Sequence, residues 1–282
     1  MTQSPEYAEI TKKASRTFYL SSLLFPKNIR NDVFVLYSYV RKMDDLIDSI
    51  PPDYSAYQQY KALTLTSLHG IESGVQLIEE FTSLIIRKNI PVTWLHSFFY
   101  SLELDYKTRE YAHFKELELF VYGVAEVIGL MMSQVMNLPE KSHPTARALG
   151  KSMQLINILR DIAEDKELGR IYLPQDELER FGITHLPPNN SKEKEQFIRF
   201  IQFQFERVRR IQNEAEKGFR YIPKSSLIAI KTASDIYYSI GKTIASNPLL
   251  IFKKKVRPPL MYILFLIIRN YIQVQWGKQY HE

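Results

Sequence analysis

Cysteine is absent from the 282 residues of this chain. Its absence excludes disulfides, thiolate metal sites and a cysteine nucleophile, and an oxidising compartment is not required. Residues 1–10 contain no apolar run that could act as a signal peptide. We therefore expect a cytoplasmic protein.

Long apolar runs are also missing. The longest, residues 260–268, has about half the length of a membrane-spanning helix, so no spanning helix is expected. Basic and aromatic residues form no concentrated stripe, which argues against a nucleic-acid partner. The net charge of +6 favours anionic partners but does not distinguish phosphorylated metabolites from membranes.

Helical periodicity, by contrast, runs through nearly the whole chain. Apolar residues recur at spacings of three and four, and Pro or Gly separates the segments. The pattern predicts helices at residues 8–20, 29–49, 55–69, 72–88, 92–109, 113–136, 143–165, 192–218, 224–246 and 259–275. Strand alternation is not sustained anywhere. We predict an all-α fold in a single domain, residues 1–282, with a flexible segment 1–8 and an apolar C-terminal helix at 259–275.

A first polar face lies on the predicted helix 29–49. Its four members are spaced four, three and four residues apart: Tyr37, Arg41, Asp44 and Asp48. Aspartates one turn apart near a helix C-terminus repel each other, and the macrodipole disfavours them further. Such oxygen ligands suit Mg²⁺, which completes its coordination with water and substrate phosphate. If this face is considered alone, the alternative to a Mg²⁺ site is a solvated acidic helix end that Arg41 and Lys42 neutralise.

A second polar face occurs on the predicted helix 143–165. Its members are spaced three, four and four residues apart: Gln154, Asn157, Asp161 and Asp165. An unpaired amide at Asn157, between Ile156 and Ile158, would be costly to bury. This face therefore needs a partner, which either another helix or a metal-bound ligand must supply.

Two separate Asp-x-x-x-Asp faces are much less expected by chance than one. Facing each other across a helical bundle, they would hold Mg²⁺ ions that bridge to a diphosphate, and Arg160 and Arg170 would meet the same anion directly. Between them, residues 120–136 place Gly123 and Gly129 in a helix that is otherwise bulky. Glycine weakens a helix by about 1 kcal/mol relative to alanine, a cost that either tight helix packing or an extended apolar ligand would explain.

The motifs that carry these residues resemble the phytoene and squalene synthase family over residues 9–257. They are Ser15-Arg-Thr-Phe18, Leu36-Tyr-x-x-x-Arg41, Asp44-Asp-x-x-Asp48, Gly129-Leu-Met-Met132, Gln154-x-x-Asn-Ile-Leu-Arg-Asp-x-x-Glu-Asp165 and Gly169-Arg-Ile-Tyr-Leu-Pro-Gln-Asp-Glu-Leu178. The resemblance implies an isoprenoid-synthase helical bundle around a central cavity. It also implies head-to-head condensation of two identical prenyl diphosphates through a cyclopropylcarbinyl diphosphate.

Carried over position by position, the resemblance assigns roles to individual residues. Binding of two or three Mg²⁺ ions, for which Mn²⁺ can substitute, falls to Asp44, Asp48, Asn157, Asp161 and Asp165. Catalytic roles fall to the four aspartates together with Tyr37 and Arg41. Substrate binding falls to Ser15, Phe18, Gln154, Asn157, Arg160, Arg170, Tyr172 and Tyr237.

Two positions depart from the family pattern. A tyrosine that is common in the family four residues before Val124 is Phe120 here, and a common glycine is Glu126. Tyr122 lies about 200° round the helix from Phe120 and does not substitute for that tyrosine. The proton acceptor is therefore not identified by the resemblance, and the released diphosphate is an alternative base.

The product depends on how the final cation is quenched. Losing a proton gives phytoene or dehydrosqualene, whereas taking a hydride from NADPH gives squalene. The chain length and the sequence around residues 103–106 and 125–126 favour the phytoene branch, with two geranylgeranyl diphosphates as substrates. Squalene or dehydrosqualene synthesis from farnesyl diphosphate is the alternative, and NADPH is needed for squalene alone. A non-enzymatic assembly or binding relative is a second alternative, although all four aspartates are retained.

The C-terminal region combines a basic cluster with the apolar residues 260–268. The cluster consists of Lys253, Lys254, Lys255 and Arg257. This arrangement fits peripheral contact with an anionic membrane. It fits equally well a final helix packed on the core beside a solvated basic turn. The sequence does not indicate the oligomeric state.

Overall fold

The structure, a computed structural model, describes residues 5–276 and is built from helices. No β-strand occurs among these residues, and a single backbone bridge joins Glu110 to Ile171. The predicted all-α fold is confirmed.

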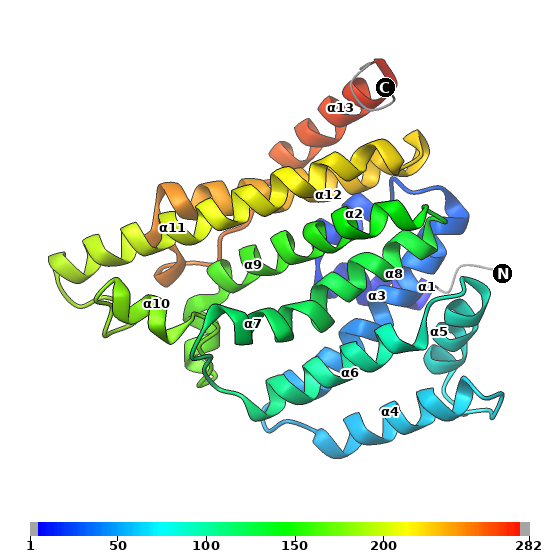
Figure 1. Cartoon of the computed structure of the whole chain (residues 1–282). Coiled ribbons are helices and arrows are strands. Elements are labelled where there is room, and N and C mark those ends of the chain that lie inside the picture. Colours follow the sequence, from blue (N-terminus) through cyan, green and yellow to red (C-terminus); the bar gives the residue numbers. More distant parts are fainter. Residues whose placement is uncertain (1–4, 277–282) are drawn as a thin grey trace.

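The helices follow one another in the order in which they are labelled in Figure 1. The α-helices are α1 (Pro5–Ala14), α2 (Arg16–Ser22), α3 (Lys27–Asp48), α4 (Tyr54–Ser67), α5 (Gln76–Arg87), α6 (Val92–Lys107), α7 (Phe114–Val121), α8 (Val127–Val135), α9 (His143–Glu167), α10 (Gln175–Arg180), α11 (Ser191–Glu216), α12 (Lys224–Ser246) and α13 (Leu260–Trp276). A π-helical turn, η1 (Tyr122–Glu126), joins α7 to α8. Short 3₁₀ turns are η2 (Glu140–Ser142), η3 (Lys217–Tyr221) and η4 (Pro248–Phe252).

The helix predicted at residues 8–20 is wrong as a single element. The chain breaks at Ser15, which has an extended backbone, and the Ser15 hydroxyl accepts a hydrogen bond from the N–H of Phe18 to cap α2. Residues 1–4 of the predicted flexible segment lie outside the described residues, and Pro5 already begins α1. The six-residue helix α10 was not predicted, because it is too short to show a helical period.

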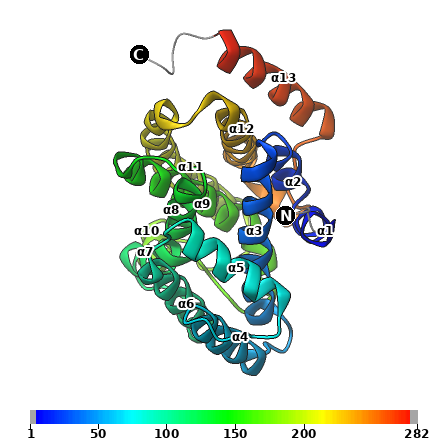
Figure 2. The ribbon, with the colours of Figure 1, turned by 90° about the vertical axis from the view of Figure 1, so that its right-hand side faces the viewer.

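The long helices run side by side across the molecule. Figure 1 shows α6, α8, α9, α11 and α12 in roughly parallel rows, and Figure 2 shows α13 outside α12, at the opposite edge from α4. Two large hydrophobic clusters fill the interior. One lies mainly among α3, α5, α6 and α8, the other among α7, α9 and α11, and Val124 in η1 packs against both.

Helices α8 and α9 approach each other closely because glycines lie at their contacts. A Cβ atom added to Gly129 would lie 2.2 Å from the backbone oxygen of Ala146, and one added to Gly150 would lie 2.2 Å from that of Ala125. Of the two explanations for Gly129, tight helix packing is therefore the one that its neighbours support. Gly129 also lines the cavity described below.

One helical stretch, residues 114–135, is long and apolar enough to span a membrane by length and composition, which the apolar runs did not predict. Of its most apolar window, 56% is buried inside the protein. The central helix of a folded core has the same properties. We interpret this stretch as such a core helix, because α6 and α9 pack against it.

We expect Gly129→Ala to lower the free energy of unfolding by about 1–3 kcal/mol, because the added methyl group would overlap a helix backbone that cannot move independently. Urea denaturation measures the change. Thr93→Ala, at an exposed position of α6, is the control and should change stability by less than about 0.5 kcal/mol. Equal stability of Gly129→Ala and the unmodified protein would contradict the close approach of α8 and α9.

Candidate active site

The two predicted aspartate faces line one polar cavity. Asp44 and Asp48 reach it from the C-terminal turns of α3, and Asp161 and Asp165 reach it from those of α9. Six further predicted site residues line the same cavity: Arg41, Gln154, Asn157, Arg160, Arg170 and Tyr172. The helical spacings of the sequence therefore did identify side chains that converge in space.

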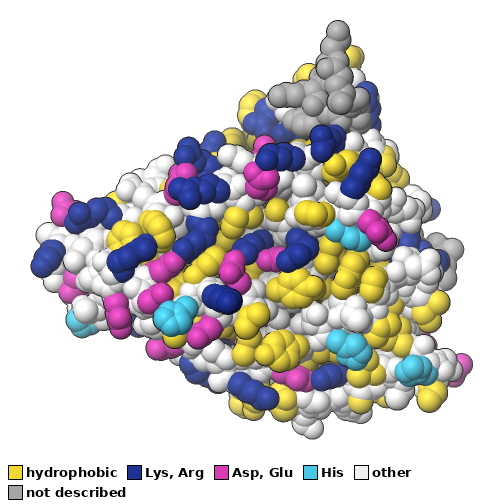
Figure 3. All heavy atoms as spheres, viewed as in Figure 1, with side chains coloured by type: hydrophobic (Ala, Val, Ile, Leu, Met, Phe, Trp, Pro, Cys, Tyr) yellow, Lys and Arg dark blue, Asp and Glu magenta, His cyan; other side chains and the backbone are white. Residues whose placement is uncertain are grey.

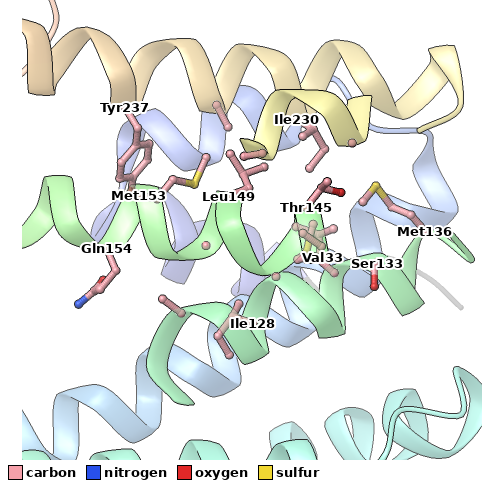
Figure 4. Close-up of a pocket in the computed structure, with 18 of the residues that line it drawn as sticks. Val33, Ile128, Ser133, Met136, Thr145, Leu149, Met153, Gln154, Ile230 and Tyr237 are labelled. Atoms are coloured by element: carbon pink, nitrogen blue, oxygen red, sulfur yellow. The ribbon is translucent and has the colours of Figure 1, made fainter. Parts of the chain in front are cut away.

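An apolar cavity of about 250 Å³ adjoins the polar one. Val124, Gln154 and Asn157 line both cavities and mark the place where they meet. In Figure 4, Gln154 and Tyr237 lie near one end of the apolar cavity, while Ser133, Met136 and Thr145 lie at the other. An elongated apolar group could thus lie along α9 with a charged end among the aspartates.

The remaining predicted residues are placed differently from one another. Phe18, Tyr37 and Tyr237 line the apolar cavity, and the rings of Phe18 and Tyr37 stack with centroids 4.6 Å apart. Ser15 is not among the residues that line either of these cavities, and its hydroxyl caps α2. A direct contact between Ser15 and substrate stays a prediction.

Asp105 of α6 is a cavity residue that the sequence analysis missed. It accepts hydrogen bonds from the Tyr172 hydroxyl at 2.5 Å and from Arg170 at 3.0 Å, and Arg170 also donates to Asp48 at 2.7 Å. Arg170 and Tyr172 belong to the segment that follows α9, so this network fixes that segment against α6 and α3. No local pattern identifies Asp105, because no other carboxylate lies three or four residues away from it and its partners are distant in the sequence.

Lys255 is the second missed residue. The sequence placed it in the basic cluster near a membrane, but its ammonium group lies 3.1 Å from Asp161 and 2.5 Å from Glu164. It reaches the second aspartate face from the segment between η4 and α13. Lys255 therefore pairs with an aspartate of the cavity, a contact that the spacing of residues on α9 could not reveal.

The carboxylates of the cavity have different electrostatic environments. Burial, followed by the charge of Asp48, raises the pKa of Asp44 well above its ordinary value. Burial and the charge of Asp161 raise the pKa of Asp165 to about 7. Burial also acts on Asp161, but the hydrogen bonds and charges of Arg160 and Lys255 outweigh it and lower the pKa of Asp161. At Asp44 and Asp165 the nearby cations do not offset burial and like charge, so the ionised forms of these two carboxylates are disfavoured.

The residues of the cavity fit Mg²⁺ that is shared with a ligand. Among residues 5–276, no group of three His, Cys, Asp or Glu side chains is assembled to hold a metal by itself. Mg²⁺ commonly binds through one or two carboxylates and takes its other oxygens from water and substrate phosphate. Asn157 Oδ1 is buried and has no hydrogen-bond partner, so an oxygen ligand stands unused beside the aspartates.

The two departures from the family pattern are structurally accommodated. Phe120 lines the polar cavity and stacks on Tyr172, with centroids 5.1 Å apart, so the phenol nearest to it is that of Tyr172. Tyr122 instead lies beneath the guanidinium of Arg147. Glu126 is buried and pairs with Arg147 at 2.8 Å. As expected, Tyr122 does not replace the missing tyrosine.

The arrangement of helices around a central cavity is the isoprenoid-synthase fold. A solved dehydrosqualene synthase superposes with a TM-score of 0.85 at 23% identity, covering 96% of each chain. A solved squalene synthase from Alicyclobacillus acidocaldarius superposes with a TM-score of 0.71 at 19% identity, covering 86% of this chain and 92% of the other. At these identities the likeness establishes the fold.

The sequence establishes the family. Residues 11–262 match squalene/phytoene synthase, and the chain belongs to this family of prenyltransferase-type enzymes, which bind prenyl diphosphates. A chloroplastic phytoene synthase of an Oncidium hybrid cultivar is 30% identical over 257 residues, covering 88% of this chain and 62% of the relative. A 15-cis-phytoene synthase of Synechococcus elongatus is 28% identical over 269 residues, covering 90% and 87%. The chain thus spans less than two thirds of the Oncidium protein but most of the cyanobacterial one.

We expect Asp165→Asn and Asp161→Asn to change the stability of the metal-free protein in opposite directions. The folded-state pKa of Asp165 is raised to about 7, so its ionised form opposes folding, and this cost grows as the pH rises towards 7. Asp165→Asn should therefore raise the free energy of unfolding at pH 8 by about 1–3 kcal/mol, and the gain should vanish below about pH 4.

The pKa of Asp161 is lowered, so its ionised form stabilises the fold above its ordinary pKa. Asp161→Asn should cost about 1–2 kcal/mol at pH 8, a loss that shrinks as acid protonates the carboxylate. Urea unfolding in the presence of a chelator measures both variants. A loss of stability in both at pH 8 would contradict the assigned electrostatics.

Proposed function

We propose that this protein condenses two geranylgeranyl diphosphates head to head, through a cyclopropylcarbinyl diphosphate, to phytoene with release of diphosphate. The observation that carries the proposal is the junction at Gln154 and Asn157, where an apolar cavity adjoins a polar cavity lined by both aspartate faces. A prenyl diphosphate has the same division, with a long apolar chain joined to a compact anion.

The length of the apolar cavity supports the longer substrate. Its lining residues on α9 extend from Thr145 to Asn157, which corresponds to roughly 18 Å at the rise of an α-helix. This length accommodates an extended chain of four isoprene units. The names of the two curated relatives, both phytoene synthases, favour the same substrate.

Mg²⁺ is part of the proposal. Two or three ions, for which Mn²⁺ can substitute, would be held by Asp44, Asp48, Asn157, Asp161 and Asp165. When bound, Mg²⁺ neutralises the diphosphate and makes it a better leaving group. The raised pKa values of Asp44 and Asp165 indicate carboxylates that would gain most from such a cation.

The chain's own residues would act on the two ends of the substrate. Arg160, Arg170 and Lys255 would bind phosphate oxygens, because each already pairs with a carboxylate at the edge of the polar cavity. The stacked rings of Phe18 and Tyr37 would face the allylic cation and stabilise it without reacting with it. The apolar walls exclude water, which would otherwise capture the cation as an alcohol.

The proton lost in each half-reaction needs an acceptor. Burial, followed by the charge of Asp105, raises the pKa of Tyr172, so its hydroxyl remains protonated and serves as a hydrogen-bond donor. Phe120 has no acceptor atom. The released diphosphate, held in place by the cations of the polar cavity, is therefore the base that we propose.

The alternative is condensation of two farnesyl diphosphates to dehydrosqualene, or to squalene with NADPH. A shorter chain also fits the apolar cavity, and solved structures with the same fold include a dehydrosqualene synthase and a squalene synthase. The two substrate classes differ in the predicted product, so one assay distinguishes them.

We expect the purified protein with Mg²⁺ and geranylgeranyl diphosphate to form a C40 hydrocarbon whose yield does not depend on NADPH. Extraction into an organic solvent and mass analysis identify the product, beside a parallel incubation with farnesyl diphosphate. Asp44→Asn is the control and should lose activity by roughly 100-fold or more. A C30 product from farnesyl diphosphate alone would replace the proposal, and no product from either substrate would favour a non-enzymatic role.

Filling the far end of the apolar cavity should discriminate between the two chain lengths. We expect Met136→Trp to lower kcat/KM for geranylgeranyl diphosphate by about tenfold or more, because excess volume in a packed wall costs about 1–3 kcal/mol. The kcat/KM for farnesyl diphosphate should fall less, since its shorter chain ends nearer to Gln154. Met261→Trp, at an exposed position of α13, is the matched control, and equal losses for both substrates would contradict this orientation.

A further inference from the structure

Helix α13 has two apolar faces, and the protein covers one of them. The covered face consists of Ile263, Leu266, Asn270 and Val274, all of which are buried. Ile263 and Leu266 pack with Ile236 of α12 and with Leu20 of α2. In Figure 1, α13 is the outermost helix on its side of the molecule.

The second face points in the opposite direction. It carries exposed apolar side chains at spacings of three, one, three and four residues: Met261, Leu264, Phe265, Ile268 and Ile272. These positions lie about half a turn away from the buried ones. Met261 is 75% exposed and Ile268 is 61% exposed. A surface helix of a globular protein normally presents polar residues there, and no part of residues 5–276 covers this face.

The charged residues of α13 and of residues 253–259 are all basic. Arg269 is the sole charged residue of this helix, and it pairs with Asp235 of α12 at 2.5 Å. Lys253, Lys254 and Arg257, which precede the helix, are exposed and form no ion pair with the described part of the chain. Figure 3 shows Lys and Arg side chains, with a few Asp and Glu side chains between them, along the edge of the molecule that carries α13.

Helix α2, which packs against the covered face of α13, carries a further exposed cation. Leu20 packs against α13, and Arg16 lies one turn earlier on the same side of α2, where it is exposed. Exposed positive charge thus occurs both in the segment that precedes α13 and on a helix that packs against its covered face. Lys255, by contrast, is directed to Asp161 and does not belong to this group.

We propose that the exposed apolar face of α13 docks on the surface of an anionic lipid membrane, with Lys253, Lys254 and Arg257 at the headgroups. A helix lying in the interface buries its apolar side among acyl chains while nearby basic residues attract anionic lipid. A second copy of this chain would bring another helix without acidic residues and another basic segment to the same place. Charge complementarity therefore favours the membrane.

This inference does not depend on the proposed reaction. It concerns a surface that α12 separates from the apolar cavity, because Ile236 of α12 faces α13 while Ile230, Ala233 and Tyr237 of α12 line the cavity. A protein without synthase activity would still bind lipid by this surface, so each proposal can fail alone.

Co-sedimentation of the full-length protein with vesicles tests the proposal. We expect binding to vesicles of phosphatidylcholine and phosphatidylglycerol, weaker binding to phosphatidylcholine alone, and a decrease with added salt. Ile268→Glu should reduce partitioning by about tenfold or more, because a carboxylate would enter the acyl region. The matched control is Ile86→Glu on α5, since Ile86 is 59% exposed and lies on a different helix.

The basic residues have a matched control of their own. The double variant Lys253→Gln/Lys254→Gln should weaken binding to anionic vesicles by roughly fivefold per charge. Lys192→Gln/Lys194→Gln at the start of α11 removes the same charge from exposed positions at the far side of the molecule. We expect this second variant to bind as the unmodified protein does.

The fluorescence of Trp276 gives a second readout. Trp276 is exposed at the end of α13, and Trp94→Phe removes the other tryptophan of the chain. A blue shift of Trp276 emission with anionic vesicles is expected. The proposal is overturned if the unmodified protein fails to bind, or if Ile268→Glu and Ile86→Glu bind equally well. A dimer in solution that Ile268→Glu dissociates, without vesicle binding, would assign the face to a second copy instead.

Discussion

Five aspartates line one polar cavity, and the repulsion between their carboxylates is the constraint on which the arrangement of this protein depends. Two of them, Asp48 and Asp161, are offset by cations of the chain, Arg170 and Lys255. Burial leaves Asp44 and Asp165 with raised pKa values. A cavity of this kind disfavours isolated ionised carboxylates, but it suits the binding of cations together with an anionic ligand.

The surrounding fold keeps these side chains in place despite their repulsion. Helices α3 and α9 are both longer than 20 residues, so their apolar segments anchor the C-terminal turns that carry the aspartates. Gly129 and Gly150 let α8 and η1 approach α9 closely, which leaves the apolar cavity as a defined space. The π-helical turn η1 brings Val124 to the junction of both cavities, and π-helical turns are frequent at functional sites. The packing that stabilises the fold thus lies away from the site, and it offsets the repulsion between the carboxylates at the site.

The surface of α13 differs from that of most surface helices in its distribution of apolar residues. Most surface helices cover one apolar face and leave a polar one to water, whereas α13 has apolar residues on both sides. The same C-terminal segment also pairs Lys255 with Asp161 of the polar cavity. The region from η4 to α13 therefore joins the candidate active site to the surface that we propose contacts lipid.

The sequence by itself determined the helical character of the chain and the members of both aspartate faces, because these depend on spacings within single helices. It also indicated the family, since its longest motif occupies one continuous segment of α9. It did not determine that Asp105 bonds to Tyr172 and Arg170, that Lys255 pairs with Asp161, or that Ser15 divides the first predicted helix. The first two contacts join segments more than 60 residues apart, and no local period reports such distances. The tertiary structure alone decided which face of α13 is covered, because an apolar residue on either side of a helix gives the same signal in the sequence.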